Sequence, residues 1–146
     1  MIRRSESPQD PWSGQMAFPG GHAAAEDRTL FDTAARETRE EVGIDARAQE
    51  FLGCLDNVQP KNVPMIVAPF VFLIMEKVDP KISKEAREIV WVPMSYLSDS
   101  KNISTFVFAI NGADLSMPCY KYSDHIIWGM SFRLIREIIS KTAAHD

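Results

Sequence analysis

The sequence has few cysteines, no long uninterrupted apolar run and no excess of basic residues. Cys54 and Cys119 are its two cysteines and show no metal-ligand spacing, so a reduced protein is expected in place of a disulfide scaffold. The longest apolar run, 63–75, contains two prolines and is too short to span a bilayer. The N-terminus lacks the apolar segment of a secretory signal. We therefore predict a soluble cytoplasmic protein that does not bind a membrane.

The charge balance is mildly acidic. The formal net charge is −4 and the isoelectric point is near 5.4. Proteins that bind nucleic acid in general show a basic footprint, so no nucleic-acid partner is expected. If an acidic chain acts on a phosphate ester, local cations must offset the charge repulsion, which favours a metal cofactor.

A chain of 146 residues is long enough for one domain with a real hydrophobic core. The distribution of strand-forming and turn-forming residues predicts strands over 15–18, 51–55, 66–75 and 89–92. It also predicts a hairpin that turns at Asn111-Gly112. Of these segments, 66–75 is the longest and is nearly all apolar, which is typical of a buried strand. A short helix is predicted over 93–97 and a final helix over 127–141, with inner side chains at Ile127, Ser131, Leu134, Ile135 and Ile138. This order of elements predicts one α/β domain with a mixed sheet covered by helices.

The clearest predicted element is an amphipathic helix. Apolar or small side chains recur every four residues from Leu30 to Val42, which is the spacing of a buried helix stripe. Asp27 or Thr29 can cap the start of this helix, and Gly43 stands where a left-handed C-terminal cap belongs.

Three glutamates cluster on the same helix. Glu37, Glu40 and Glu41 fall within one sector at about 100° per residue. They repel one another in an isolated helix, whereas a bound Mg²⁺ ion, which prefers carboxylate oxygen, makes the cluster favourable. A solvated acidic face with pairs such as Arg36–Glu40 explains the same pattern, because such faces are common. The cluster alone leaves both interpretations open.

The run from Gly21 to Ile44 resembles the Nudix box, Gly-x5-Glu-x7-Arg-Glu-φ-x-Glu-Glu-x-Gly-φ, in which φ is apolar. The residues in register are Arg36, Glu37, Glu40, Glu41, Gly43 and Ile44. His22 stands at the position of the first glycine of the box, so this chain has one extra residue before the helix. The first acidic position of the box then falls on Glu26 or Asp27.

Two flanking segments look like the coenzyme A pyrophosphatase branch of the Nudix superfamily. Arg4-Ser5 is followed by Gly14-Gln15-Met16-Ala17-Phe18-Pro19-Gly20-Gly21, at a spacing one residue longer than in that branch. Near the C-terminus, the segment 127–135, Ile-Trp-Gly-Met-Ser-Phe-Arg-Leu-Ile, is similar to that branch's Ile-Trp-Gly helix. The resemblance therefore extends over nearly the whole chain.

The resemblance implies a single Nudix hydrolase domain over 1–146. Its fold would be the α/β/α sandwich with a mixed β-sheet of that superfamily, without the usual first strand or strands. Because an unpaired sheet edge promotes association, we expect either a homodimer or a trimmed sequence.

The resemblance also implies Mg²⁺-dependent hydrolysis, with Mn²⁺ as an alternative metal, of the pyrophosphate bond in a nucleoside diphosphate linked to another moiety. Coenzyme A or a derivative is the favoured substrate. Glu37, Glu40 and Glu41 are the expected metal ligands, and Arg36 is expected to orient a helix glutamate.

Other residues receive roles from the same resemblance. The general base is Glu40 or one of two later glutamates, Glu85 and Glu88. Substrate-binding roles fall on Arg4, Gly20 and Gly21. Two alternatives stay open: a Nudix hydrolase for ADP-ribose, dinucleotides or nucleoside triphosphates, and a non-catalytic Nudix-fold binding module.

Overall fold

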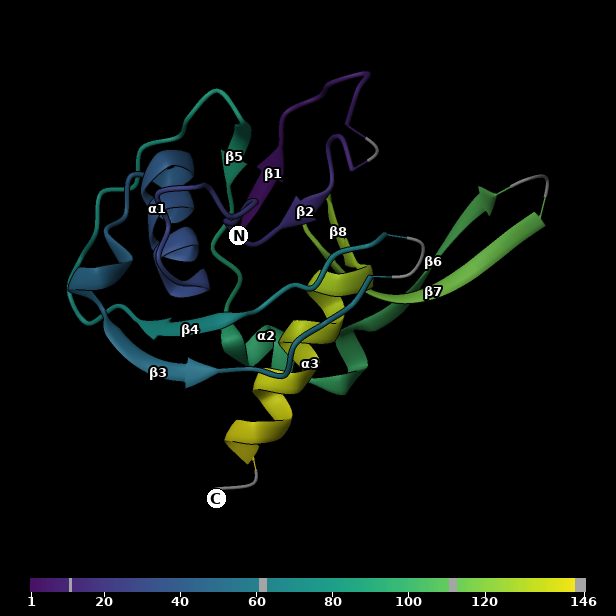
Figure 1. Cartoon of the computed structure of the whole chain (residues 1–146). Coiled ribbons are helices and arrows are strands. Elements are labelled where there is room, and N and C mark those ends of the chain that lie inside the picture. Colours follow the sequence, from purple (N-terminus) through teal and green to yellow (C-terminus); the bar gives the residue numbers. More distant parts are fainter. Residues whose placement is uncertain (11, 61–62, 111–112, 144–146) are drawn as a thin grey trace.

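The structure is a computed structural model of the chain and describes residues 1–10, 12–60, 63–110 and 113–143. In these ranges the chain forms three α-helices and three small antiparallel sheets (Figure 1). The helices are α1 (Leu30–Val42), α2 (Met94–Ser98) and α3 (Gly129–Ala143). Short 3₁₀ turns, η1 and η2, cover Ala46–Ala48 and Ser100–Asn102.

The strands pair in three groups. The first sheet has the order β2-β1-β5 and consists of β1 (Ile2–Arg4), β2 (Met16–Ala17) and β5 (Ala86–Ile89). The second pairs β3 (Glu50–Cys54) with β4 (Phe70–Leu73). The third has the order β6-β7-β8 and consists of β6 (Ile103–Ile110), β7 (Ala113–Tyr122) and β8 (His125–Trp128).

Every strand pair in the described ranges is antiparallel, so the expected single mixed sheet is not what these residues form. A mixed sheet requires a parallel pair joined by a crossover. Helix α1 has the crossover position, but it connects β2 with β3, which belong to different sheets. Strand β1 has a neighbour on each side, so the unpaired edge expected at the start of the chain does not lie at β1.

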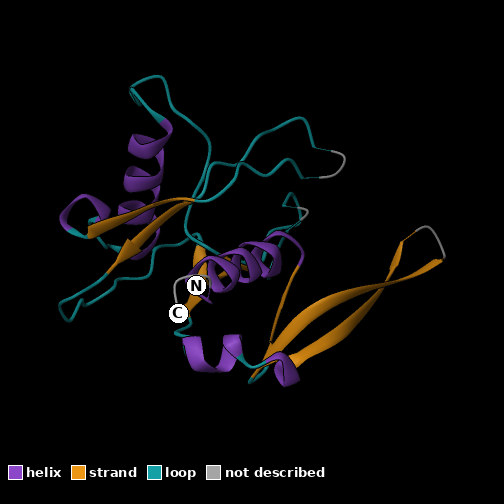
Figure 2. Ribbon diagram, turned by 90° about the horizontal axis from the view of Figure 1, so that it is seen from below, coloured by secondary structure: helices purple, strands orange, loops and turns teal. Residues whose placement is uncertain are grey.

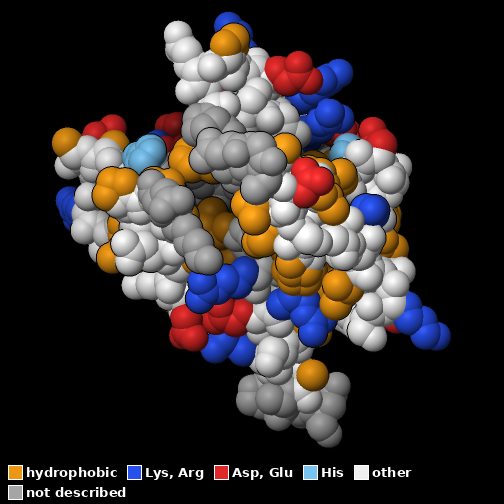
Figure 3. Space-filling model, turned by 90° about the vertical axis from the view of Figure 1, so that its right-hand side faces the viewer, with side chains coloured by type: hydrophobic (Ala, Val, Ile, Leu, Met, Phe, Trp, Pro, Cys, Tyr) orange, Lys and Arg blue, Asp and Glu red, His pale blue; other side chains and the backbone are white. Residues whose placement is uncertain are grey.

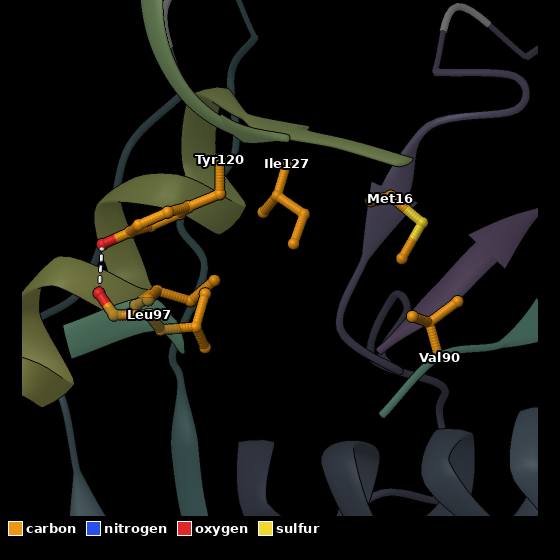
Figure 4. Close-up of a cluster of buried hydrophobic side chains, with 6 residues drawn as sticks. Met16, Val90, Leu97, Tyr120 and Ile127 are labelled. Carbon is orange, nitrogen blue, oxygen red and sulfur yellow. Dashed lines mark hydrogen bonds between the residues drawn. The ribbon is translucent and has the colours of Figure 1, made fainter. Parts of the chain in front are cut away.

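Two hydrophobic clusters place helices on both faces of the first sheet. Ile2 of β1 and Ala86 of β5 pack with Val42 of α1. On the other face, a larger cluster joins the sheet to α2, α3 and the third sheet through Met16, Val90, Leu97, Tyr120, Ile127 and Ile135 (Figure 4). The Tyr120 hydroxyl donates a hydrogen bond of 2.8 Å to the backbone oxygen of Leu97. The helix-sheet-helix layering implied by the resemblance is therefore present around this sheet.

Local signals set the ends of α1 as predicted. The Thr29 side chain accepts the Asp32 N–H, and Asp32 accepts the Thr29 N–H in return, which forms a capping box. Gly43 has φ 69° and donates its N–H to the Arg39 oxygen. The predicted stripe is wrong at its first member, because Leu30 is 49% exposed and burial starts one turn later.

Several strand predictions need correction. The segment predicted as a long buried strand over 66–75 forms only β4, and none of its residues is buried. Its sheet has two strands, and its phenylalanines pack on one side against Phe31 of α1, with ring centroids about 5.6 Å apart for Phe70 and Phe72. β5 begins at Ala86, earlier than predicted, and Ile127 lies in β8 instead of the final helix.

The predicted hairpin is confirmed as β6 and β7, while its turn at Asn111-Gly112 lies outside the described residues. The two cysteines are unpaired, with Cys54 exposed and Cys119 buried. None of the described helices combines the length and the apolar composition that a bilayer crossing requires.

Candidate active site

Glu41, in the last turn of α1, is a buried carboxylate next to the loop that follows β2. It is 3% exposed, and its Oε2 accepts the Gly20 backbone N–H at 2.9 Å. Burial raises the pKa of the Glu41 carboxyl to about 7, and the charges of Glu37 and Glu85 add to the rise. Near neutral pH this group is therefore divided between its protonated and charged forms, and a nearby cation would favour the charged form.

Glu37 lies one turn earlier and packs against Gly21. A Cβ atom at Gly21 would overlap the Glu37 carboxylate, so any side chain at this position would displace that carboxylate. A Cβ atom at Gly20 would meet open space, and Gly20 instead contributes its backbone N–H to Glu41. The two glycines predicted to serve the site thus act differently, one through close approach and the other through its amide.

Arg36 binds three carboxylates at once. Its Nη1 donates to Glu37 Oε1 at 2.7 Å and to Glu40 Oε2 at 3.2 Å. Its Nε and Nη2 donate to the two oxygens of Asp27 at 3.1 and 2.9 Å, and Nη2 also reaches the His22 backbone oxygen at 3.0 Å. The predicted pairing of Arg36 with a helix glutamate is present, and the guanidinium fork fixes the orientation of Glu37.

Asp27, one of the two candidates for the first acidic position of the box, joins the site through Arg36. Its side chain is 5% exposed, and Oδ2 also accepts hydrogen bonds of 2.9 Å from the Ala24 N–H and the Thr33 hydroxyl. The hydrogen bond from Arg36 and these further bonds hold the pKa of Asp27 well below its usual range. Asp27 therefore does not cap α1. Asp27 instead fixes the position of Arg36, which in turn orients Glu37.

Arg4 and Glu85 approach Glu41 from the first sheet. Arg4 ends β1, pairs in register with Ala86 of β5, and forms a salt bridge to Asp10 at 2.8 Å. Its positive charge lowers the pKa of Glu41, whereas Glu85, just before β5, raises it. The pairing of β1 with β5 thus brings Arg4, predicted to bind substrate, and Glu85, predicted as a base, to the same carboxylate.

Glu88 has different surroundings from Glu85. Its Oε1 lies 3.4 Å from Nε2 of His125, a buried residue of β8, and Asp124 Oδ1 lies 3.5 Å from the same nitrogen. The two later glutamates predicted as alternative bases therefore differ in their surroundings, because the charge of Glu85 acts on Glu41 whereas Glu88 lies beside His125.

An open groove runs along the other side of α1. Its volume is about 800 Å³, which lies within the range of about 300–1,000 Å³ for small-molecule sites. Arginines and carboxylates line it together, at Glu26, Asp27, Arg28, Asp32, Arg36, Arg39, Glu40, Asp45 and Arg47. Arg36 and Glu40 line this groove, and Arg36 also binds Glu37 on the side of the helix that carries Glu41.

The chemistry of the donor set fits a hard divalent cation. A buried carboxylate, Glu41, stands beside Glu37 and Glu85, and carboxylate oxygens are the ligands that Mg²⁺ prefers. In the side-chain positions seen, Glu37 and Glu40 are bonded to Arg36, and no three acidic, histidine or cysteine side chains of the described ranges converge as a metal site. Ligation by the predicted set therefore requires Glu40, whose side chain is 60% exposed, to turn from Arg36.

Comparison with known proteins shows the family to which the chain belongs. A family model for the NUDIX domain matches residues 1–107, and the chain belongs to that family. Uncharacterized protein C14C4.10c of Schizosaccharomyces pombe is 37% identical over 107 residues, which are 66% of this chain and 32% of that protein. Uncharacterized Nudix hydrolase NudL of Photorhabdus laumondii is 31% identical over 134 residues, 86% of this chain and 67% of that protein.

A relative with an assigned substrate is the mitochondrial coenzyme A diphosphatase NUDT8 of Mus musculus. It is 26% identical over 135 residues, which are 90% of this chain and 63% of that protein. The chain thus spans about a third of the yeast relative and about two thirds of the other two.

Proposed function

We propose that this chain is a Mg²⁺-dependent pyrophosphohydrolase, with Mn²⁺ as an alternative metal. Its substrate would be a nucleoside diphosphate linked to another moiety. The observation that carries the proposal is the buried carboxylate of Glu41, held by the Gly20 amide beside Glu37. A buried acid among other acids is unfavourable by itself, so its presence is best explained by a cation that binds there.

Different residues of the chain would bind the metal, position its ligands and accept a proton. When bound, Mg²⁺ neutralises the charge of the diphosphate oxygens and lowers the pKa of water. Glu37, Glu40 and Glu41 would hold the ion, and Arg36, anchored by Asp27, keeps Glu37 in place. Of the two later glutamates, Glu85 is the one that we propose accepts a proton from the attacking water, because its charge acts on Glu41.

Coenzyme A or a derivative is the substrate that we favour. Support comes from the name of the NUDT8 relative and from the two segments that look like the coenzyme A pyrophosphatase branch. Arg4 belongs to one of those segments, and its positive charge acts on Glu41, so it would offer a phosphate oxygen a cationic partner. The expected products are 3′,5′-ADP and a phosphopantetheine.

The test is turnover of a substrate panel by the purified chain with Mg²⁺. Coenzyme A, ADP-ribose, NADH and nucleoside triphosphates are incubated separately, and the products are assigned by mass spectrometry. Glu37→Gln is the inactivating variant, and Glu76→Gln, an exposed surface change, is its matched control. Cleavage of coenzyme A by wild type and Glu76→Gln but not by Glu37→Gln supports the proposal.

Other outcomes reject it in defined ways. Cleavage of ADP-ribose or nucleoside triphosphates without coenzyme A would keep the reaction and change the substrate. Tight binding of a nucleotide without turnover would instead indicate a non-catalytic module. For the base, Glu85→Gln is expected to lower kcat more than Glu88→Gln, and the reverse order would exclude Glu85.

A further inference from the structure

The β6–β7 hairpin projects from the rest of the molecule. Figures 1 and 2, which view the chain from two directions, both show it extending away from the helices and the other sheets. β8 pairs with β7 only from Cys119 to Tyr122, so the outer part of the hairpin has no third strand among the described residues. A two-stranded ribbon is marginally stable in water, and this one extends to Ile110 and Ala113 without such support.

One face of the hairpin is apolar. Opposite residues of an antiparallel pair point to the same side, which places Phe106 with Met117 and Phe108 with Leu115. Phe106 and Phe108 stack at 5.7 Å between ring centroids, and both contact Trp128, at 5.2 and 4.9 Å. Seen from the side toward which the hairpin projects, hydrophobic side chains gather in the middle of the face and most charged side chains lie around them (Figure 3).

Strand β6 is an edge strand without the usual protection against pairing. In the described part of the chain it pairs with β7 alone. Its eight residues, Ile103–Ile110, include no charged residue and no proline. Natural edge strands are normally interrupted by lysine, proline or a bulge, and β6 pairs with β7 in continuous register. Its backbone groups on the outer edge are thus available to another strand.

The exposed area is larger than that of a compact monomer. A compact protein of this mass, 16.5 kDa, exposes about 7,500 Å². This chain exposes 9957 Å². The excess is several times the roughly 800 Å² that each partner contributes to a standard interface. The chain therefore exposes more surface than a compact monomer of its mass, and the projecting hairpin contributes to this excess.

We propose that β6 pairs antiparallel with β6 of a second copy of this chain. The pairing would join the two third sheets into one, in the order β8-β7-β6-β6-β7-β8, around a two-fold axis. An identical copy fits because the strand has no charge that would select a charged partner, and an antiparallel pair of identical strands is self-complementary. The two aromatic faces then adjoin and form one continuous apolar surface.

A substitution on β6 tests the proposal with a matched control on β7. Val107 is 56% exposed and lies near the middle of β6, so Val107→Lys places like charges close together across the two-fold axis. Ser116 is also exposed, lies directly opposite Val107 and points to the same face, but it belongs to β7. Ser116→Lys therefore adds the same charge to the same hairpin without placing it on the β6 edge.

Sedimentation of the full chain over a wide concentration range is the measurement. Wild type and Ser116→Lys are expected to show twice the monomer mass of 16.5 kDa at high concentration. Val107→Lys is expected to raise the dimer Kd by about tenfold or more. Circular dichroism checks that each variant is folded, and turnover should be unchanged because neither position belongs to the site.

Amide hydrogen exchange gives a second readout. Peptides that cover β6 should gain protection as wild type is concentrated, whereas those of β4, which belongs to another sheet, should not. Three results would overturn the proposal: a monomer at every concentration, a dimer that both lysine variants weaken equally, or a dimer without added protection in β6.

Discussion

Replacing the buried acid Glu41 by glutamine is expected to stabilise the metal-free protein at neutral and higher pH. Glutamine keeps the shape of the side chain, and its Oε1 still accepts the Gly20 N–H. What it removes is a charge in a site that is only 3% exposed and next to Glu37. Because its buried charge is not neutralised without a metal ion, Glu41 is expected to lower the stability of the metal-free protein.

The size of the effect follows from the pKa. The pKa of Glu41 is raised from 4.5 to about 7 in the folded protein. Each unit corresponds to about 1.4 kcal/mol, so the charged form destabilises the fold by about 3 kcal/mol. Between pH 4.5 and 7 the folded protein holds a proton that the unfolded chain has released. The contribution of Glu41 to stability therefore falls as pH rises through this window and stays low above it.

Urea unfolding in the presence of a chelator measures this difference. Glu41→Gln and wild type should have similar free energies of unfolding near pH 4.5, and the variant should be more stable by about 3 kcal/mol at pH 8. The control Glu76→Gln changes an exposed glutamate and should follow wild type at every pH. Added Mg²⁺ should stabilise wild type at pH 8 and have little effect on Glu41→Gln.

The reasoning would be refuted if Glu41→Gln were less stable than wild type at pH 8 without metal. That result would mean that the positive charge of Arg4, which lowers the pKa of Glu41, outweighs burial. A parallel pH dependence of the two proteins would likewise show that Glu41 titrates normally.

Three further substitutions address other parts of the site and core. Gly21→Ala should displace the Glu37 carboxylate and lower kcat strongly, while thermal unfolding shifts little, because the alanine methyl would occupy the space of that carboxylate. Arg36→Lys loses the forked contact to Asp27, and activity should fall about 10- to 100-fold in a turnover assay. Tyr120→Phe leaves a buried backbone oxygen without its donor and should lower the free energy of unfolding by about 1–3 kcal/mol in urea, with activity unchanged. Equal loss of activity in Tyr120→Phe would show that the core and the site are coupled.

Local features were predictable from the sequence. The helix α1 with its cap at Thr29 and its glycine stop at Gly43 depends on interactions within four residues, and these have clear signatures. The β6–β7 hairpin is likewise local, since only two residues separate its strands in the sequence. Both elements appear where the sequence placed them.

Long-range pairings were not predictable. The pairing of β1 with β5 joins residues more than eighty positions apart, and it places Arg4 and Glu85 where their charges act on Glu41. The hydrogen bond between Asp27 and Arg36 joins the loop before α1 to the helix itself. Helical periodicity does not extend into that loop, so it cannot predict this contact. The error over 66–75 has the same origin, because an apolar run does not reveal whether another layer covers it.

The sequence by itself determined that Arg36 and the glutamates lie together on one helix, because helix geometry needs no tertiary information. The resemblance of this run to the Nudix box, not the helix geometry, implied the class of chemistry. Only the tertiary structure decided how these groups differ. The loop after β2 and the first sheet bury Glu41, whereas Glu40, one position earlier, remains exposed. Burial and neighbouring charge set the pKa, and both depend on which distant segments pack against the helix.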